Sequence, residues 1–369
     1  MRRLSIVHTE SSTGWGGQEI RTLTEARGML DRGHRVTLLT PPQAEIHPAA
    51  ERLGIPVVAL PIDHKRVRPL LSLRRWLAAH GRELDVINTH SSTDSWLAAL
   101  ACASLRHMPP IVRTRHVSTA INNRFSTRWL YLKATAHIVI TGEDLRRQLH
   151  EHNGYPLDHM TSVPTGIDLD RFRPLPKSES RARLHLSDKP TLGILATLRD
   201  WKGHDYLLEA FALLRKDFPD WHLLIIGDGP WRPRLDERVA RLDLAGAITF
   251  VGNQDDVPTW LSTLDLFVLP SFGDEGVPQS IMQAMACGLA VVSTPVGGIP
   301  EAVRDQETGL LVPPRDAAAL AGALSRLMRD PALRQRMGAA GRQQALARFG
   351  IDIMLDRMEA VFSQHGRRI

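Results

Sequence analysis

Two cations three residues apart, Arg199 and Lys202, have types and a spacing that predict a chemical role. They lie in "LRDWKG" (198–203), directly after an apolar run that is typical of a buried strand. Together they can neutralise a diphosphate, because arginine binds two phosphate oxygens at once and lysine acts as a compact point charge. The alternative is that they are two surface cations at the start of a helix.

A carboxylate and an amide follow in "SFGDEGVPQSIMQAMACG" (271–288). Pro278 suits the first position of a helix and Gly288 its C′ position, so Glu275 is expected just outside the helix N-terminus. Gln283 is then more than one turn inside the helix. A carboxylate that accepts hydrogen bonds from sugar hydroxyls would explain Glu275, since Asp274 could cap the helix equally well.

Glycines and a histidine follow other predicted strands. "GWGG" (14–17) places Gly16 and Gly17 before a helix, where backbone N–H groups can approach a phosphate. This segment lacks the spacing of a dinucleotide fingerprint or a P-loop, and a plain strand–helix turn would also use glycine. "GDGP" begins with Gly227, and His116 ends "RTRH". A structural histidine is the default interpretation, but its place after a strand favours a functional role.

The elements that position these residues alternate short β-branched runs with longer helical stretches, which predicts parallel sheets covered on both faces. Two such series indicate two doubly wound, Rossmann-like α/β domains. We expect strands over 4–9, 35–40, 57–60, 85–90, 110–115, 137–141 and 160–164, and then over 191–197, 222–227, 247–252, 265–270, 290–295 and 308–313.

The domain boundaries follow from composition. Residues 1–170 form the predicted N-terminal domain, and 171–188, rich in Pro, Ser and charge, the predicted linker. Residues 189–348 form the predicted C-terminal domain, and 349–369 a final helix that packs back on the N-terminal one. Ligands of open α/β sheets bind beyond the carboxyl ends of the strands, so we expect the two domains to face each other across a cleft.

Composition sets further limits. Two cysteines among 369 residues cannot form a disulfide framework, which favours a reduced, cytoplasmic setting. Residues 1–165 hold 21 Lys and Arg against 14 Asp and Glu, whereas the remainder is nearly balanced. The basic surplus, as in "KRVRPLLSLRRWL" (65–77), predicts an anionic acceptor or peripheral contact with an anionic membrane; the alternative is a solvated helix face. A nucleic-acid partner is not expected, because the basic residues lack an interleaved aromatic platform on which bases could stack.

Several motifs in this order resemble the GT-B glycosyltransferases of glycosyltransferase family 4 (glycosyl transferases group 1). The resemblance covers nearly the whole chain. The motifs are "GWGGQEIRTLTEARGMLDRGHRVTLLT", "VPTGIDLDRF", "LRDWKGHDYLLEAF", "IIGDGP" and "PSFGDEGVPQSIMQAMACGLAVVSTPVGGIPE".

The resemblance implies a retaining enzyme that moves a sugar from a nucleotide-diphosphate sugar (NDP-sugar) to a glycan or glycolipid acceptor. Cell-surface polysaccharide or lipopolysaccharide biosynthesis would fit. The C-terminal domain is expected to hold the donor and the N-terminal domain the acceptor. Retention is expected by same-face substitution, in which the leaving phosphate helps to take the acceptor proton, with no cofactor and no required metal.

By the same resemblance, Arg199 and Lys202 hold the diphosphate and stabilise the leaving group, and His116 contacts the donor sugar and the reacting centre. Glu275 binds the sugar hydroxyls. The expected donor-binding backbone comes from Gly16, Gly17, Gly227, Gly276 and Val277. The family's second glutamate, which binds the ribose, falls on Gln283, so we expect donor affinity to be weaker by roughly tenfold.

Two other functions stay open from the sequence. One is a synthase or phosphorylase of the same fold that uses phosphate or a small sugar as acceptor. The other is a non-catalytic relative that binds sugar nucleotides, for which Gln283 would be an early sign.

Overall fold

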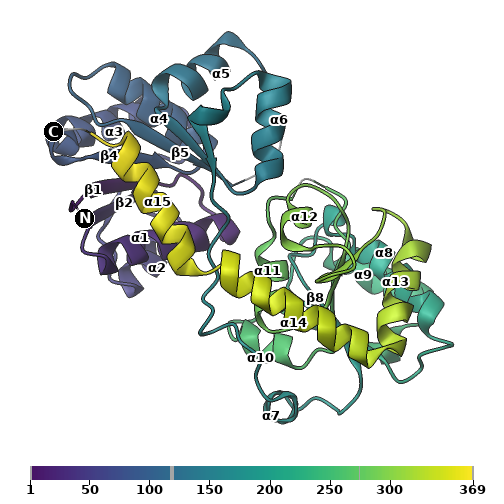
Figure 1. The fold of residues 1–369 in the computed structure, drawn as a ribbon. Helices are drawn as coiled ribbons and strands as arrows, with labels where there is room; N and C mark the ends of the chain where they lie inside the picture. Colours follow the sequence, from purple (N-terminus) through teal and green to yellow (C-terminus); the bar gives the residue numbers. More distant parts are fainter. Residues whose placement is uncertain (1, 117–119, 274, 368–369) are drawn as a thin grey trace. The chain divides into compact units, whose positions relative to one another are not determined.

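The computed structural model describes residues 2–116, 120–273 and 275–367. The chain divides into two compact units (Figure 1). The first comprises Met1–Gly166 together with Ile351–Ile369, and the second Ile167–Gly350. Each unit is built on a parallel sheet with helices between the strands, as the alternating pattern predicts.

The first unit contains a seven-stranded sheet with the order β3-β2-β1-β4-β5-β6-β7. Its strands are β1 Ser5–Thr9, β2 Arg35–Thr40, β3 Val57–Ala59, β4 Val86–Thr89, β5 Ile111–Arg115, β6 His137–Ile140 and β7 Met160–Ser162. Its helices are α1 Gly17–Asp31, α2 Ile46–Arg52, α3 Val67–His80, α4 Ser92–Ala103, α5 Phe125–Trp129, α6 Glu143–Asn153 and α15 Ile351–His365. Shorter helical turns are η1 Gly81–Glu83, η2 Leu130–Ala134 and η3 Leu157–His159.

Alternate residues of the central strands enter separate cores on the two faces of this sheet. Ile6 and Val86 belong to one buried cluster, and Val7 and Ile87 to the other. Because successive side chains of a strand point to opposite faces, strands buried on both sides must be apolar throughout. This is why these runs were recognisable in the sequence.

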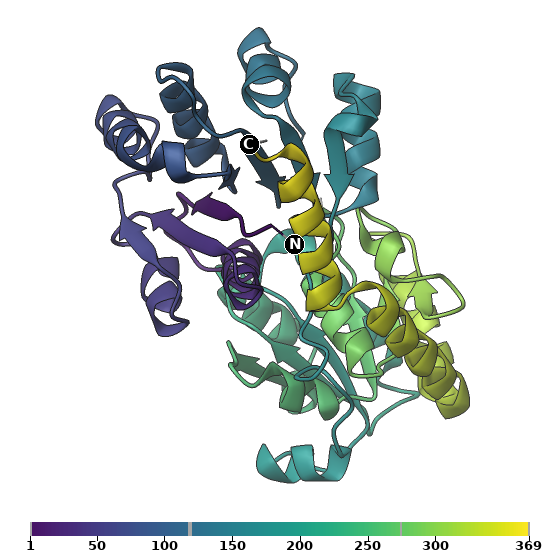
Figure 2. The ribbon, with the colours of Figure 1, turned by 60° about the vertical axis from the view of Figure 1, so that its left-hand side comes forward.

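Helix α15 completes one of these cores from the far end of the chain. Figures 1 and 2 show it beside the elements of the first unit. Met358 and Phe362 are fully buried there with residues of α1 and β1. Glu359 accepts a hydrogen bond from Arg32 (3.1 Å) and lies 3.2 Å from His34 Nε2. The expected final helix is thus part of the first unit.

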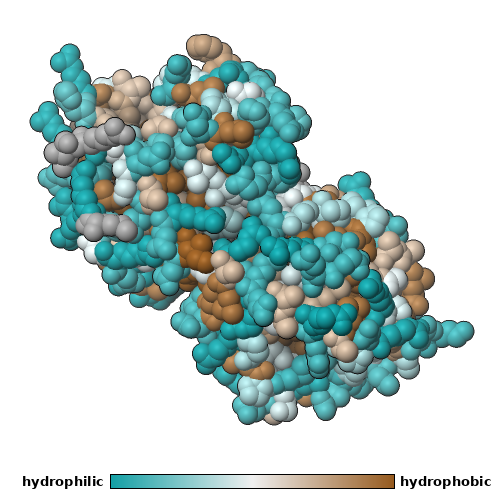
Figure 3. All heavy atoms as spheres, in the orientation of Figure 1, coloured by the Kyte–Doolittle hydropathy of each residue, from teal (hydrophilic) through white to brown (hydrophobic). Residues whose placement is uncertain are grey.

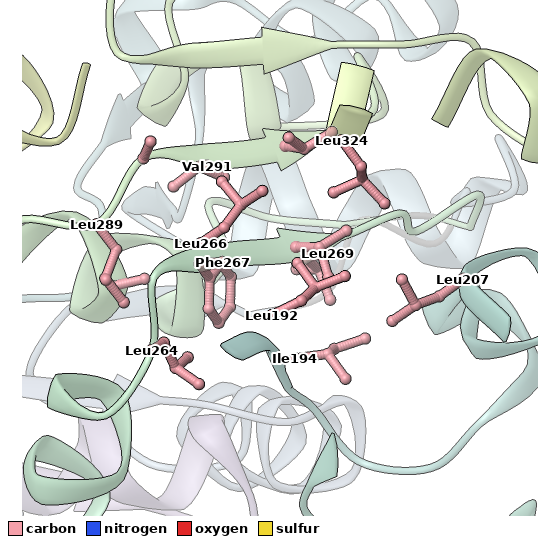
Figure 4. Close-up of a cluster of buried hydrophobic side chains, with 14 of the residues drawn as sticks. Leu192, Ile194, Leu207, Leu264, Leu266, Phe267, Leu269, Leu289, Val291 and Leu324 are labelled. Carbon is pink, nitrogen blue, oxygen red and sulfur yellow. The ribbon is translucent and has the colours of Figure 1, made fainter. Parts of the chain in front are cut away.

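The second unit contains a six-stranded parallel sheet with the order β10-β9-β8-β11-β12-β13. Its strands are β8 Thr191–Leu195, β9 His222–Ile226, β10 Ile248–Gly252, β11 Leu266–Leu269, β12 Val291–Ser293 and β13 Gly309–Leu311. Its helices are α7 Lys177–Arg183, α8 His204–Leu214, α9 Arg232–Arg241, α10 Val257–Ser262, α11 Gln279–Ala286, α12 Ile299–Ala302, α13 Ala317–Arg329 and α14 Pro331–Arg348, with turns η4 Asp200–Lys202 and η5 Ala245–Ala247. Figure 4 shows its core, where Leu192, Phe267 and Val291 of adjacent strands pack among leucines.

The predicted linker is wrong. Residues 171–188 belong to the second unit and include helix α7. The guanidinium of Arg181, on this helix, is buried and donates to Asp265 Oδ2 (3.0 Å) and to the Thr263 carbonyl (3.1 Å). Composition does not distinguish a charged residue in a buried ion pair from one exposed to solvent. For this reason the charged composition of the segment predicted a linker. The first unit also ends at Gly166 rather than at residue 170.

The visible face of the molecule is mostly hydrophilic, with smaller hydrophobic areas among the polar side chains (Figure 3). Within the described part of the chain, no helix combines the length and the apolar character needed to cross a membrane.

Candidate functional site

The second unit brings two of the predicted site residues into direct contact. Lys202 lies in turn η4 after β8, and Glu275 lies in the loop after β11. Lys202 Nζ donates to Glu275 Oε1 over 2.6 Å, and Ser271 Oγ donates to the same oxygen over 2.7 Å. Strands β8 and β11 are neighbours in the sheet, so the loops that follow them meet at one edge. Both side chains are largely buried, at 20% and 9% exposed.

The loop after β12 fixes the backbone of Glu275. The Gly298 N–H donates to the Glu275 carbonyl over 3.0 Å. Gly297 has φ +52°, and a Cβ there would lie 2.0 Å from the same carbonyl oxygen. A side chain at position 297 is therefore excluded by contact as well as by conformation. The glycines of "VGGIPE" allow this loop to hold the acidic loop in place.

Arg199 has a different environment from Lys202. Its side chain is exposed, and its guanidinium carbon lies 5.1 Å from the centroid of the Trp201 ring. The two cations share one turn, since the Lys202 N–H donates to the Arg199 carbonyl over 3.2 Å. Among the residues that the structure describes, no carboxylate forms an ion pair with Arg199, so its charge is available to a ligand at this edge.

Gly227 holds the loop after β9 against the loop after β8. Its φ is +127°, and a Cβ there would lie 2.2 Å from the Ala196 carbonyl oxygen. The next residue, Asp228, accepts a hydrogen bond from the Leu198 N–H over 3.0 Å. The close approach explains glycine at this position and places "GDGP" beside the turn that carries Arg199.

Helix α11 begins one residue later than predicted. Pro278 occupies its N-cap with an extended backbone, and Gln279 is the first helical residue. Proline fixes φ near −65°, which suits the cap position as well as the first turn. Ile281, Met282 and Met285 are fully buried, as the predicted apolar stripe requires, and Gly288 follows the helix with φ +79°.

The remaining predicted residues of this unit surround the start of α11. Val277 is buried and Gly276 is half-buried, directly after Glu275. Gln283 is half-buried in the second turn, four residues after Gln279 and off the buried stripe. Asp274, considered above as a cap, lies outside the described residues.

In the first unit, Gly16 is the N-cap of α1 and Gly17 its first residue. The Gly16 carbonyl accepts the first helical hydrogen bond, from the Ile20 N–H over 3.1 Å. The preceding loop is tied to the helix through Glu10, which accepts from Ser12 N–H (2.8 Å) and Gln18 Nε2 (2.6 Å). Burial, with a contribution from Asp94, raises the pKa of Glu10 to about 8. Gly16 and Gly17 thus lie at the N-terminus of α1, and the hydrogen bonds of Glu10 fix the loop before them to this helix.

His116 is the end of a chain of three histidines. Its Nε2 lies 3.0 Å from His90 Nδ1, and His90 Nε2 lies 2.9 Å from His8 Nδ1. Successive rings stack with centroids 5.2 Å apart. Burial lowers the pKa of His8 to about 4 and holds the pKa values of His90 and His116 well below the usual range. All three imidazoles are therefore neutral near pH 7.

Sequence reasoning did not single out His8 or His90. They lie at the carboxyl ends of β1 and β4, and His116 follows β5. Because β1, β4 and β5 are consecutive in the sheet, the three side chains meet at one edge. The segments "HTE" and "NTHSS" place polar residues at the ends of predicted strands, which could have marked His8 and His90 as candidates. To predict that they meet His116, however, the order of the strands in the sheet must be known.

His116 also lines a pocket of about 470 Å³ within the first unit. Other wall residues are Gln18, Lys65, His90, Trp96, Arg113 and Arg115. The pocket is basic and lies at the carboxyl edge of the sheet, the position at which open α/β sheets bind ligands.

The predicted residues thus fall into two groups, each within its own unit. Gly16, Gly17 and His116 belong to the first, and the others to the second. Within the described ranges, no group of three or more His, Cys, Asp or Glu side chains is arranged to hold a metal ion. The expectation that no metal or cofactor is required stays a prediction.

Two parallel-sheet, Rossmann-like units make up the GT-B architecture. The family description "Glycosyltransferase Family 4" matches residues 15–171, and "Glycosyl transferases group 1" matches residues 176–344. The chain belongs to this glycosyltransferase family.

Two curated relatives illustrate its range. The chain is 34% identical over 201 residues to the GDP-mannose-dependent alpha-(1-6)-phosphatidylinositol monomannoside mannosyltransferase of Mycolicibacterium smegmatis, in a match that covers 52% of the chain and 53% of that protein. It thus spans about half the length of that relative. It is 32% identical to the lipopolysaccharide core biosynthesis mannosyltransferase LpsB of Rhizobium meliloti, covering 74% of the chain and 76% of LpsB.

A solved structure shares the fold. HepE of Anabaena, crystallised with UDP, aligns with a TM-score of 0.87 over 98% of this chain and all of that one, at 20% identity. At this identity the likeness concerns the fold alone.

Proposed function

We propose that the chain is a retaining glycosyltransferase that moves a hexose from an NDP-sugar to a glycan or glycolipid acceptor. The observation that carries this proposal is the Lys202–Glu275 contact, with Arg199 exposed on the same turn. One cation contacts a carboxylate and a second cation lies on the same turn, which is the set of charges needed for a diphosphate joined to a sugar.

In this proposal Arg199 and Lys202 neutralise the diphosphate and stabilise it as the leaving group. Glu275 accepts hydrogen bonds from hydroxyls of the donor sugar, and Gln283 contacts the ribose. The bond from the anomeric carbon to the phosphate oxygen breaks while a bond to the acceptor oxygen forms on the same face. The acceptor proton passes to the leaving phosphate, so no enzyme nucleophile is needed.

The first unit is proposed to hold the acceptor and, with Gly16, Gly17 and His116, to contact the donor. The neutral His116 can act there as a hydrogen-bonding group without adding charge. The relatives named above act on a phosphatidylinositol mannoside and in lipopolysaccharide core biosynthesis. Both names support an acceptor in glycolipid or cell-surface polysaccharide assembly for this chain.

We further propose a cytoplasmic enzyme that associates peripherally with an anionic membrane. Val67 is 71% exposed at the start of α3, and Phe125 is 87% exposed at the start of α5. Exposed Arg66, Arg68 and Arg124 flank them. Apolar side chains among cations suit the surface of an anionic bilayer.

A thermal-shift screen against UDP, GDP, ADP, CMP and dTDP, with and without their sugars, tests the donor proposal. A ligand bound only by the folded chain raises the melting temperature by mass action. One responding nucleotide names the donor class, and Arg199→Ala should abolish the response. No response to any nucleotide at millimolar concentration would exclude an NDP-sugar donor.

A further inference from the structure

Arg113 is a buried cation without the partners that such a group requires. It lies on β5, is 4% exposed and lines the pocket of the first unit. Its Nε and Nη1 are buried and have no hydrogen-bond partner among the described residues. Burial, with a contribution from the charge of Arg115, lowers the pKa of Arg113, which reflects the cost of holding this charge away from water.

Two further cations line the same pocket. The Arg115 guanidinium donates from Nη1 to the Tyr131 hydroxyl over 3.0 Å. The guanidinium carbon of Arg113 lies over the same Tyr131 ring, 4.3 Å from its centroid. Lys65 Nζ donates to Ser92 Oγ over 3.0 Å at the pocket wall. Burial and the charge of Arg113 lower the pKa of Lys65, so these cations act on one another.

The buried carboxylate of Asp94 attracts Arg113 and Lys65 electrostatically, but its hydrogen bonds go to other groups. Asp94 accepts hydrogen bonds from Thr9 Oγ1 (2.6 Å), from the His90 N–H (2.9 Å) and from the Ser91 N–H (2.8 Å). Its oxygens are therefore occupied by groups other than Arg113. Over the part of the chain that the structure describes, neither Arg113 nor Lys65 forms an ion pair with a carboxylate.

We propose that this pocket binds a phosphate group of the acceptor, with Arg113 as its main ligand. This inference rests on the proposed function, because it assigns the chemistry of the acceptor. A guanidinium offers a planar pair of donors that matches two oxygens of a phosphate, and the two neighbouring cations match its charge. A volume of about 470 Å³ is within the range of small-ligand sites and holds a phosphate together with a polyol or sugar ring.

The pocket that is proposed to bind the acceptor phosphate also contains the histidine that is proposed to contact the donor. His116 and His90 form part of its wall, at the carboxyl ends of β5 and β4. A phosphate held by Arg113 would anchor the acceptor in the unit that is proposed to bind it. The same phosphate chemistry could come from a soluble phosphomonoester or from a lipid headgroup.

The test measures binding of glycerol 3-phosphate, glycerol and glycerate to the full chain by calorimetry. The chain is first saturated with the nucleotide found in the thermal-shift screen, so that the diphosphate site is occupied. We expect glycerol 3-phosphate to bind, glycerol not to bind, and glycerate to bind at least tenfold more weakly. Equal binding of glycerate and glycerol 3-phosphate would overturn the assignment of a phosphate.

Variants locate the binding. Arg113→Gln should weaken glycerol 3-phosphate binding at least tenfold and Lys65→Gln severalfold, while the exposed control Arg52→Gln leaves it unchanged. Because Lys65 is near the surface, its variant keeps the test valid if Arg113→Gln fails to fold. Undiminished binding in both pocket variants would overturn the proposal.

The two sources of phosphate are separated with vesicles. Capture of the chain by phosphatidylglycerol vesicles is measured against capture by phosphatidylcholine vesicles. If Arg113→Gln reduces this difference, the phosphate is that of a lipid headgroup. If it reduces only glycerol 3-phosphate binding, the phosphate is that of a soluble acceptor. The Arg113→Gln variant should still show the thermal shift with nucleotide. If the wild-type protein itself binds no nucleotide, that result contradicts the proposed function and not the phosphate site.

Discussion

Lys202 Nζ and Glu275 Oε1 lie 2.6 Å apart, although the two residues come from loops after different strands. The contact pairs the cation proposed to bind the diphosphate with the carboxylate proposed to bind the sugar. In the structure they form an ion pair. A donor that brings both a negative diphosphate and hydroxyl groups can replace this pair with two contacts of matching chemistry.

Replacing Lys202 by alanine should lower kcat/KM about 10²- to 10³-fold, as loss of one group that stabilises developing charge does in other enzymes. The measurement is steady-state kinetics with the donor identified by thermal shift. Lys216→Ala, an exposed lysine of the same unit, is the control. Full activity in Lys202→Ala would show that the lysine only neutralises Glu275.

Gln283→Glu should tighten donor binding about tenfold. A hydrogen bond to a charged acceptor contributes about 1.5–3 kcal/mol, against about 0.5–1.5 kcal/mol for a neutral pair. Calorimetric titration with the donor nucleotide checks this, and Gln335→Glu on the exposed face of α14 controls for added negative charge. An unchanged Kd would remove Gln283 from the ribose site.

The contribution of His8 to the stability of the first unit should fall as the pH falls from about 6.5 towards 4. Burial lowers the pKa of His8 from 6.5 to about 4, so the unfolded chain takes up a proton in this range before the folded chain does. His8 alone accounts for roughly 2 kcal/mol between pH 7.5 and pH 5.

The variant His8→Phe removes this titration while keeping a ring beside Phe362. Urea unfolding at both pH values measures the free energy of unfolding. On going from pH 7.5 to pH 5, the change in the free energy of unfolding should be about 2 kcal/mol more positive in the variant than in the wild type. The same pH dependence in both proteins would be inconsistent with a His8 that is neutral in the fold.

Anionic vesicles should capture the full chain at low salt and release it at high salt, because screening weakens contacts between exposed charges. Replacing both Val67 and Phe125 by serine should reduce capture about tenfold, since each buries apolar area at the surface of the bilayer. Leu213→Ser changes an equally apolar side chain, 62% exposed in the second unit, and should have no effect. No capture of the wild type at low salt would exclude the membrane proposal.

The strands of both units were predictable because each is buried on two faces and is therefore a continuous apolar run. The turn from Arg199 to Lys202 and the loop around Glu275 were predictable for a related reason, since unusual polar residues follow such runs. Segment 171–188 was not, because Arg181 makes its buried contacts with residues far along the chain.

The histidine chain shows a second limit. His8, His90 and His116 are single residues in unrelated segments, and none has a periodic pattern. They become neighbours only through the sheet order β1-β4-β5. Arg113 was visible as a basic residue, but whether it is solvated or buried without partners depends on packing that no local pattern records.

Helix α15 has a consequence for the order in which the chain is made. The second unit is continuous in sequence, so the ribosome releases all of it before α15 emerges. Until then the apolar face that Met358 and Phe362 cover on the first unit stays uncovered. Domains fold as units during synthesis, and exposed apolar surface favours misassembly. The core of the first unit, which is synthesised first, therefore cannot be completed until α15 has been made.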